Sequence, residues 1–118
     1  MSFYDDLNDP NLNYTNVISR AGPLKIWIES YRKSEKQGEN LITNLDKLVE
    51  FVVKRCKNND ISERVTDEEI KRINSLFNAM YAYVDCCPGI SIDAARSGKE
   101  EISYLYEAVA YCLNMNLE

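Results

Sequence analysis

Two adjacent cysteines are the first candidates for chemistry in this chain. Cys86 and Cys87 precede Pro88-Gly89 in the stretch DCCPGISIDAARSGKEE, residues 85–101. Structural zinc normally takes thiolates from Cys-x₂-Cys pairs, and a redox motif also places two residues between its cysteines. Adjacent cysteines fit neither spacing, and a disulfide between neighbours would strain the peptide bond that joins them. We therefore predict a turn with free thiols and no bound metal.

The composition removes most other catalytic arrangements. The chain has no histidine, which is the commonest general base and a common transition-metal ligand. Acid pairs at i, i+3, which can hold Mg²⁺ on one face of a helix, occur only at Asp6/Asp9 and Asp60/Glu63. Both pairs lie outside the helices predicted below. We expect a protein that is not an enzyme and needs no cofactor.

Length and charge restrict the class of protein further. A chain of 118 residues with 45% hydrophobic residues predicts a single domain, residues 1–118. The net charge of −5 is mixed in sign, which argues against binding to a DNA or RNA polymer. The longest apolar runs are too short to cross a bilayer, and the first residues lack the features of a signal peptide. We expect a cytoplasmic protein that does not insert into a membrane.

The hydrophobic periodicity predicts an all-α fold, a small bundle of four helices. We place the helices at residues 23–37, 40–57, 67–85 and 99–115, preceded by an extended or flexible arm at residues 1–14. A short helical turn at residues 15–21 should end at Gly22, so that Pro23 starts the next helix, which Gly38 then ends. The predicted core is formed by Leu45, Val49, Val52, Ile73, Phe77, Leu105 and Val109.

Two capping boxes position the last two helices. Thr66 with Glu69 should start the third helix, and Ser97 with Glu100 the fourth. Cys56 and Cys112 fall on apolar stripes and should be buried. Tyr83, Tyr104 and Tyr111 fall outside the stripes, which predicts an aromatic surface and a homo-oligomer.

The hairpin at residues 66–116 carries a resemblance to a known family. Its Cys-Pro connection is followed by the helix KEEISYLYEAVAYCLN, residues 99–114. This unit resembles the helical-hairpin domain of phage proteins that sequester the cyclic oligonucleotide signals of bacterial immunity. In that domain a Cys-Pro turn precedes a Leu-Glu-Glu-Ala-Val-like core, whereas here the sequence is Leu-Tyr-Glu-Ala-Val and the helix lies further from the turn. The match covers less than half of the chain.

The resemblance implies a non-enzymatic anti-defence protein that encloses a cyclic nucleotide between protomers of a homo-oligomer. Such a ligand needs cations or helix N-termini for its phosphates and flat side chains for its bases. The candidates for these roles are Arg20, Lys25, Trp27, Arg32, Arg96, Lys99, Tyr104 and Tyr111. Trp27 can equally be a core anchor, and the lysines and arginines a solvated face. The alternative is a small acidic inhibitor or adaptor that blocks a host protein, since a tyrosine pair also suits a protein interface.

Overall fold

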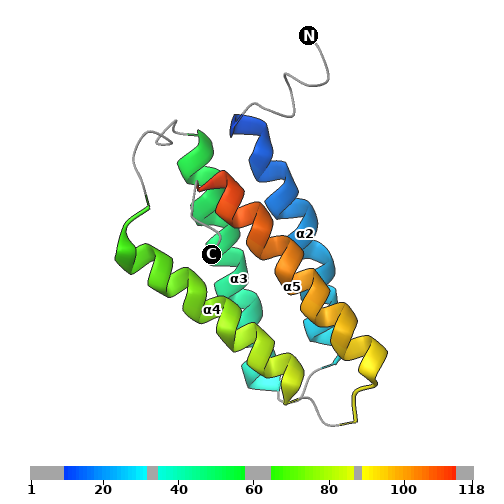
Figure 1. Cartoon of the computed structure of the whole chain (residues 1–118). Helices are drawn as coiled ribbons and strands as arrows, with labels where there is room; N and C mark the ends of the chain where they lie inside the picture. The colour runs from blue at the N-terminus through cyan, green and yellow to red at the C-terminus, as the bar shows by residue number, and fades with distance from the viewer. Residues whose placement is uncertain (1–9, 32–34, 58–64, 87–88, 114–118) are drawn as a thin grey trace.

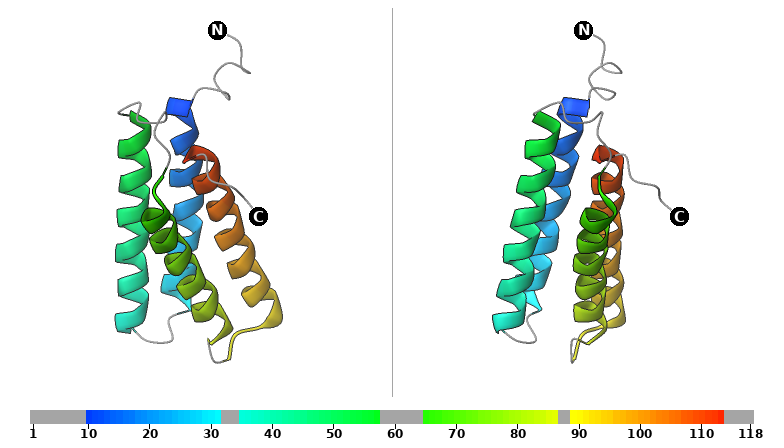
Figure 2. Two further views of the ribbon diagram at one scale, coloured as in Figure 1. Left: turned by 60° about the vertical axis from the view of Figure 1, so that its left-hand side comes forward. Right: turned by 90° about the vertical axis from the view of Figure 1, so that its left-hand side faces the viewer.

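The chain folds into a bundle of long helices, and the predicted all-α class is confirmed. The computed structural model describes residues 10–31, 35–57, 65–86 and 89–113. Within these ranges the elements are α2 (Pro10–Ser30), α3 (Glu35–Lys57), α4 (Asp67–Asp85) and α5 (Ile92–Cys112), with no strand (Figure 1). The helices form two layers, α2 with α3 and α4 with α5, as the right-hand view of Figure 2 shows. One hydrophobic core lies between the layers.

The first helix is longer than predicted. Helix α2 runs without a break through Gly22 and Pro23, so the predicted end at Gly22 is wrong, and so is the extended arm over residues 10–14. Residues 1–9 lie outside the described part. A proline inside a helix removes the donor to the carbonyl four residues earlier, here that of Ser19. Ser19 and Pro23 are both exposed, so water can reach this part of the helix. Burial of apolar side chains on both sides of Pro23 offsets the cost of the lost hydrogen bond. They are Val17, Ala21, Leu24 and Ile28.

The second helix also begins earlier than predicted. Helix α3 starts at Glu35, so Gly38 lies inside its first turns and is buried rather than ending a preceding helix. The stripe that packs into the core contains Leu41, Leu45, Leu48, Val52 and Cys56. Val49, predicted to be buried, is only half-buried and packs against the edge of the core. The other predicted core residues are buried.

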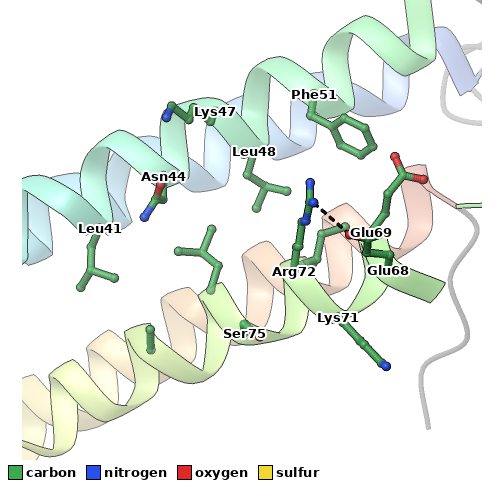
Figure 3. A pocket seen from close by; sticks show the side chains of 13 residues that line it. Leu41, Asn44, Lys47, Leu48, Phe51, Glu68, Glu69, Lys71, Arg72 and Ser75 are labelled. Atoms are coloured by element: carbon green, nitrogen blue, oxygen red, sulfur yellow. Dashed lines mark hydrogen bonds and ion pairs between the residues drawn. The ribbon is translucent and has the colours of Figure 1, made fainter. Parts of the chain in front are cut away.

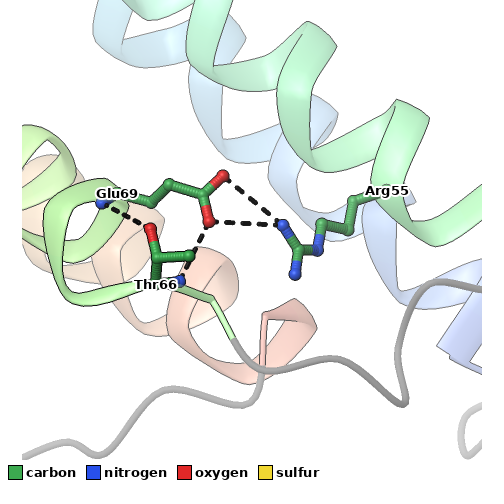
Figure 4. A network of polar contacts seen from close by, with 3 residues as sticks. All are labelled: Arg55, Thr66 and Glu69. Carbon is green, nitrogen blue, oxygen red and sulfur yellow. Dashed lines mark hydrogen bonds and ion pairs between the residues drawn. The ribbon is translucent and has the colours of Figure 1, made fainter.

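The start of α4 follows the sequence prediction. The backbone N–H of Glu69 donates to Thr66 Oγ1 at 3.1 Å, and the backbone N–H of Thr66 donates to Glu69 Oε1 at 2.9 Å. This capping box satisfies two of the N–H groups that a helix start leaves unpaired. Figure 4 shows the box together with Arg55 of α3.

The predicted start of α5 is wrong. The helix begins at Ile92, where the Ser91 hydroxyl accepts a hydrogen bond from the Ala94 N–H at 3.1 Å. Ser97 and Glu100 therefore lie within the helix and do not cap it. The earlier start is stabilised by α2, because Ala94 and Gly98 both contact Trp27. Gly89 in the connection has a φ of 74°, which favours glycine.

Candidate functional site

The two lysines predicted to hold phosphates are paired with carboxylates of neighbouring helices. Lys25 Nζ lies 2.5 Å from Asp46 Oδ1, which joins α2 to α3. Lys99 Nζ lies 2.6 Å from Asp85 Oδ1, which joins α5 to α4. These are partly exposed pairs, so each contributes little to stability. In each pair, however, the aspartate neutralises the positive charge that would attract the phosphate of a ligand.

Trp27, the predicted stacking residue of α2, belongs to the core. Its side chain is 7% exposed, and its Nε1–H donates to the Ala94 carbonyl oxygen at 3.0 Å. The indole ring packs against Gly98 on one side and lies 4.9 Å from the Tyr31 ring on another. A base could stack on Trp27 only if α2 and α5 separated. This placement matches the core-anchor alternative.

Arg20 and Tyr104 are the two predicted site residues that the fold brings together. The Arg20 guanidinium lies 4.9 Å from the centroid of the Tyr104 ring, across the seam between α2 and α5. This distance is in the range of a cation–π contact. Arg96 is exposed two helical turns earlier on α5, and Arg32 lies outside the described residues.

The tyrosines outside the predicted stripes have different environments. Tyr104 is 43% exposed and Tyr111 62% exposed, as predicted, but Tyr83 is only 4% exposed and lies in the core. The prediction for Tyr83 is wrong because Tyr83 follows Leu76 and Met80 at helical spacing and packs with them in the core, where its hydroxyl donates to the Tyr31 carbonyl oxygen at 3.5 Å. Tyr104 and Tyr111 stand one heptad apart on the exposed side of α5.

Acidic side chains share that side of α5. Asp93, Glu100 and Glu107 follow at intervals of seven residues, and all three are exposed. Together with Tyr104 and Tyr111 they form a surface that we call the α5 face. Arg96 lies between Asp93 and Glu100, and Arg20 of α2 covers Tyr104, so three carboxylates stand against two guanidinium groups on this side. The α5 face therefore keeps a surplus of negative charge, which suits a partner with cations.

An open groove runs between α3 and α4, and sequence analysis did not predict it. Its volume is about 870 Å³, and side chains of both helices line it (Figure 3). The apolar lining consists of Leu41, Leu48, Phe51, Ile73, Leu76 and Ala79, and the charged lining of Lys47, Glu68, Glu69, Lys71 and Arg72. We call this the α3–α4 groove. The available signal was Phe51, an aromatic residue beside the predicted stripe of α3.

The acids of the groove are already paired at one end. Arg55 Nη1 lies 3.4 Å from both carboxylate oxygens of Glu69, and Arg72 Nη2 lies 3.0 Å from Glu68 Oε1. The backbone N–H of Thr66, followed by the Thr66 hydroxyl and Arg55, holds the pKa of Glu69 below its usual value. Lys47 and Lys71 form no ion pair with a described residue, so the groove presents a surplus of positive charge in an acidic protein.

The described cysteines occupy two kinds of site. Cys56 and Cys112 are buried with their thiols in contact across α3 and α5, and Cys86 is exposed. Burial raises the pKa of Cys112 to about 12 and also raises the pKa of Cys56. Among the described residues, no group of three or more His, Cys, Asp or Glu could hold a metal ion. Cys87 lies outside the described residues, and the absence of metal stays a prediction.

Comparisons of the chain with protein-family models, with curated proteins and with solved structures gave no significant match. The candidate site is therefore defined by the geometry of this chain alone. None of the described helices is both long enough and apolar enough to cross a membrane.

Proposed function

We propose that this chain is a non-enzymatic protein-binding module, an inhibitor or adaptor that receives a helix of its partner in the α3–α4 groove. The observation that carries the proposal is the open apolar groove with cations on both of its helices. Apolar surface that stays in contact with water is unfavourable, and covering it drives association. Binding would therefore release water from Phe51, Leu76 and Ala79, the apolar lining residues that are not buried.

The dimensions of the groove suit a short helix. Its lining extends over residues 41–51 of α3 and 68–79 of α4. At 1.5 Å per residue each wall is about 16 Å long, which is roughly three helical turns. A helix of that length places two or three apolar anchors, at i, i+3 or i+4, and i+7, on one face. Lys47 and Lys71 would stand beside acidic or neutral side chains at the flanks of that face.

The test is selection of helical peptides from a display library on the immobilised protein, followed by calorimetry. Leu76→Glu should weaken binding of the selected peptides by about a hundredfold, because it places an unpaired charge in the apolar lining. Ala82→Glu is the matched control, since Ala82 is an exposed residue of α4 that does not line the groove. Peptides that bind both variants equally well would refute the proposal.

A cyclic oligonucleotide is the second candidate ligand, which the protein would sequester from bacterial immunity. It is supported by the contact between Arg20 and the half-exposed Tyr104, with Arg96 exposed on the same helix as Tyr104. Stacking of a base on an aromatic ring contributes about 1–3 kcal/mol, so Tyr104→Ala should weaken such binding by roughly tenfold. The measurement is calorimetric titration of refolded protein with cyclic di- and trinucleotides. Absence of heat from all of them would exclude this candidate.

The variants Lys25→Ala and Lys99→Ala test whether either lysine binds the cyclic nucleotide. If Lys25 or Lys99 leaves its aspartate to hold a phosphate, removing it should weaken nucleotide binding by about tenfold or more, the usual effect of losing a charge-assisted hydrogen bond. If the ion pairs persist, these variants should bind the nucleotide as the wild type does.

A further inference from the structure

We propose that the α3–α4 groove is occupied by the α5 face of a second copy of this chain. The inference rests on the proposed function, because it names a partner for the same groove. It predicts a homo-oligomer in which one copy contributes Tyr104 and Tyr111 and the next contributes the groove.

The chemistry of the α5 face complements that of the groove. Its acids Asp93, Glu100 and Glu107 form no ion pair with a described residue, and they follow one line along the helix. Tyr104 and Tyr111 lie beside that line, and both are exposed. The face is therefore an acidic surface with two exposed tyrosines, which complements the apolar and cationic lining of the groove.

The groove supplies the opposite set of groups. Phe51, Leu76 and Ala79 provide an apolar floor for the tyrosine rings, and Lys47 and Lys71 provide cations for Glu100 and Glu107. Opposite charges across an interface fix the register of the two partners and suppress incorrect pairing. Two α5 faces would pair less favourably, because each carries a surplus of acids and neither supplies the apolar floor and the lysines of the groove.

The positions of the two surfaces determine the symmetry. In the right-hand view of Figure 2, α3 and α4 lie in front, and α2 and α5 lie behind them. The groove and the α5 face are thus different surfaces of one protomer, and contact between them is heterologous. Each copy keeps one surface of each kind available, so assembly continues beyond the dimer until a ring closes or a chain extends.

The contact should be weak and dependent on salt. One helix in a groove covers less than the roughly 800 Å² per partner of a standard stable interface, which is typical of transient association. The charged groups lie near the surface, so added salt screens their attraction. We expect a dissociation constant in the micromolar to millimolar range at low salt, and a higher one at high salt.

The test uses one variant of each surface. Lys47→Glu reverses a charge in the groove, and Glu107→Ala/Tyr111→Ala removes two groups of the α5 face. Each should weaken self-association by about tenfold or more, the usual effect of losing a charge-assisted contact. Lys36→Glu is the matched control, because Lys36 is exposed on α3 and does not line the groove. Light scattering over a micromolar to millimolar concentration series measures the change.

A mixture of the two variants distinguishes heterologous from isologous contact. The groove of the α5-face variant is intact, and so is the α5 face of the groove variant. Mixing should therefore restore association, and it should stop at a dimer because the remaining two surfaces are both impaired. An isologous dimer would not be restored by mixing.

Three results would overturn the inference. They are a wild type that stays monomeric throughout the series, a dimer that Lys47→Glu leaves intact, and a mixture that does not associate. The proposed function fails separately, through the peptide selection with Leu76→Glu. If peptides bind the groove but the protein stays strictly monomeric, the groove does not bind a second copy of the chain. The proposed function would still hold in that case.

Discussion

Gly98 of α5 lies directly against the indole ring of Trp27 of α2. A Cβ atom at position 98 would stand 2.7 Å from Trp27 Cε2 and 2.8 Å from Cζ2. The ring cannot easily move away, because its Nε1–H is held by the Ala94 carbonyl. The absence of a side chain at position 98 thus allows α2 and α5 to approach closely.

We predict that Gly98→Ala destabilises the protein although alanine favours helix formation. Overpacking a core typically costs about 1–3 kcal/mol, and the gain in helix propensity of up to about 1 kcal/mol offsets only part of it. Gly22→Ala is the matched control, since a Cβ there would have nothing within 4 Å. That variant should be more stable by about 0.5–1 kcal/mol. Urea unfolding measures the change in the free energy of unfolding for each variant. The same change in the same direction for both variants would contradict the packing argument.

Phe77→Ala should be among the most destabilising single changes in the protein. Phe77 is 2% exposed, and its ring meets the Tyr106 ring edge-on with centroids 4.9 Å apart. Removing such a side chain leaves a cavity and typically costs about 3–5 kcal/mol. Phe77→Leu retains most of the volume and should cost less. Thermal unfolding followed by circular dichroism compares the two, and a loss below 1 kcal/mol for Phe77→Ala would show that the core is loosely packed there.

Glu69 should make stability dependent on acid pH. The capping hydrogen bonds and Arg55 lower its pKa in the folded state, so the folded protein binds the proton less readily than the unfolded chain does. Its contribution is therefore fully present above the ordinary glutamate pKa of about 4.3, and it is lost as the pH falls through the lowered folded value. Glu69→Gln should be less stable than the wild type at neutral pH.

The difference in the free energy of unfolding between the wild type and Glu69→Gln should become smaller below pH about 4.3, because protonation of Glu69 then removes the same charge from the wild type. Denaturant unfolding across an acid pH series measures it. Glu68→Gln serves as the control, since Glu68 is exposed and takes no part in the capping box. A difference that stays constant with pH would contradict the role of the Glu69 charge.

Cys56 and Cys112 should be inert in the folded protein. Only the thiolate reacts with disulfide reagents, and burial raises the pKa of both thiols. In a Cys86→Ser/Cys87→Ser variant, Ellman's reagent should detect no rapid reaction until denaturant is added. Rapid reaction of both remaining thiols under native conditions would contradict the packing of α3 against α5.

The raised pKa of Cys112 should also make the protein less stable at alkaline pH. The unfolded thiol loses its proton above about pH 8.5, whereas the folded Cys112 keeps its proton up to a pKa of about 12. The stability that the neutral thiol contributes is thus complete below pH about 8.5 and is lost as the pH rises toward the folded value. Cys112→Ala should show a smaller decline in stability over that range.

The sequence by itself determined the helical class, the helices α3 and α4 to within a few residues of their ends, and six of the seven core residues that it predicted. These features depend on interactions between residues three or four positions apart, such as the box of Thr66 and Glu69. The side chains that carry the periodic pattern are the ones that became buried. Local chemistry was sufficient there because it agreed with the packing.

Only the tertiary structure decided the course of α2, the start of α5 and the nature of the binding surfaces. Gly22-Pro23 favours a break locally, but burial on both sides of it, with Trp27 against Gly98, keeps α2 continuous. The pairing of Lys25 with Asp46 joins residues 21 positions apart, and the α3–α4 groove is lined by two helices that are separate in the sequence. Such relationships depend on distances between helices, which no local pattern specifies, since the free energy of packing is gained only when the helices meet.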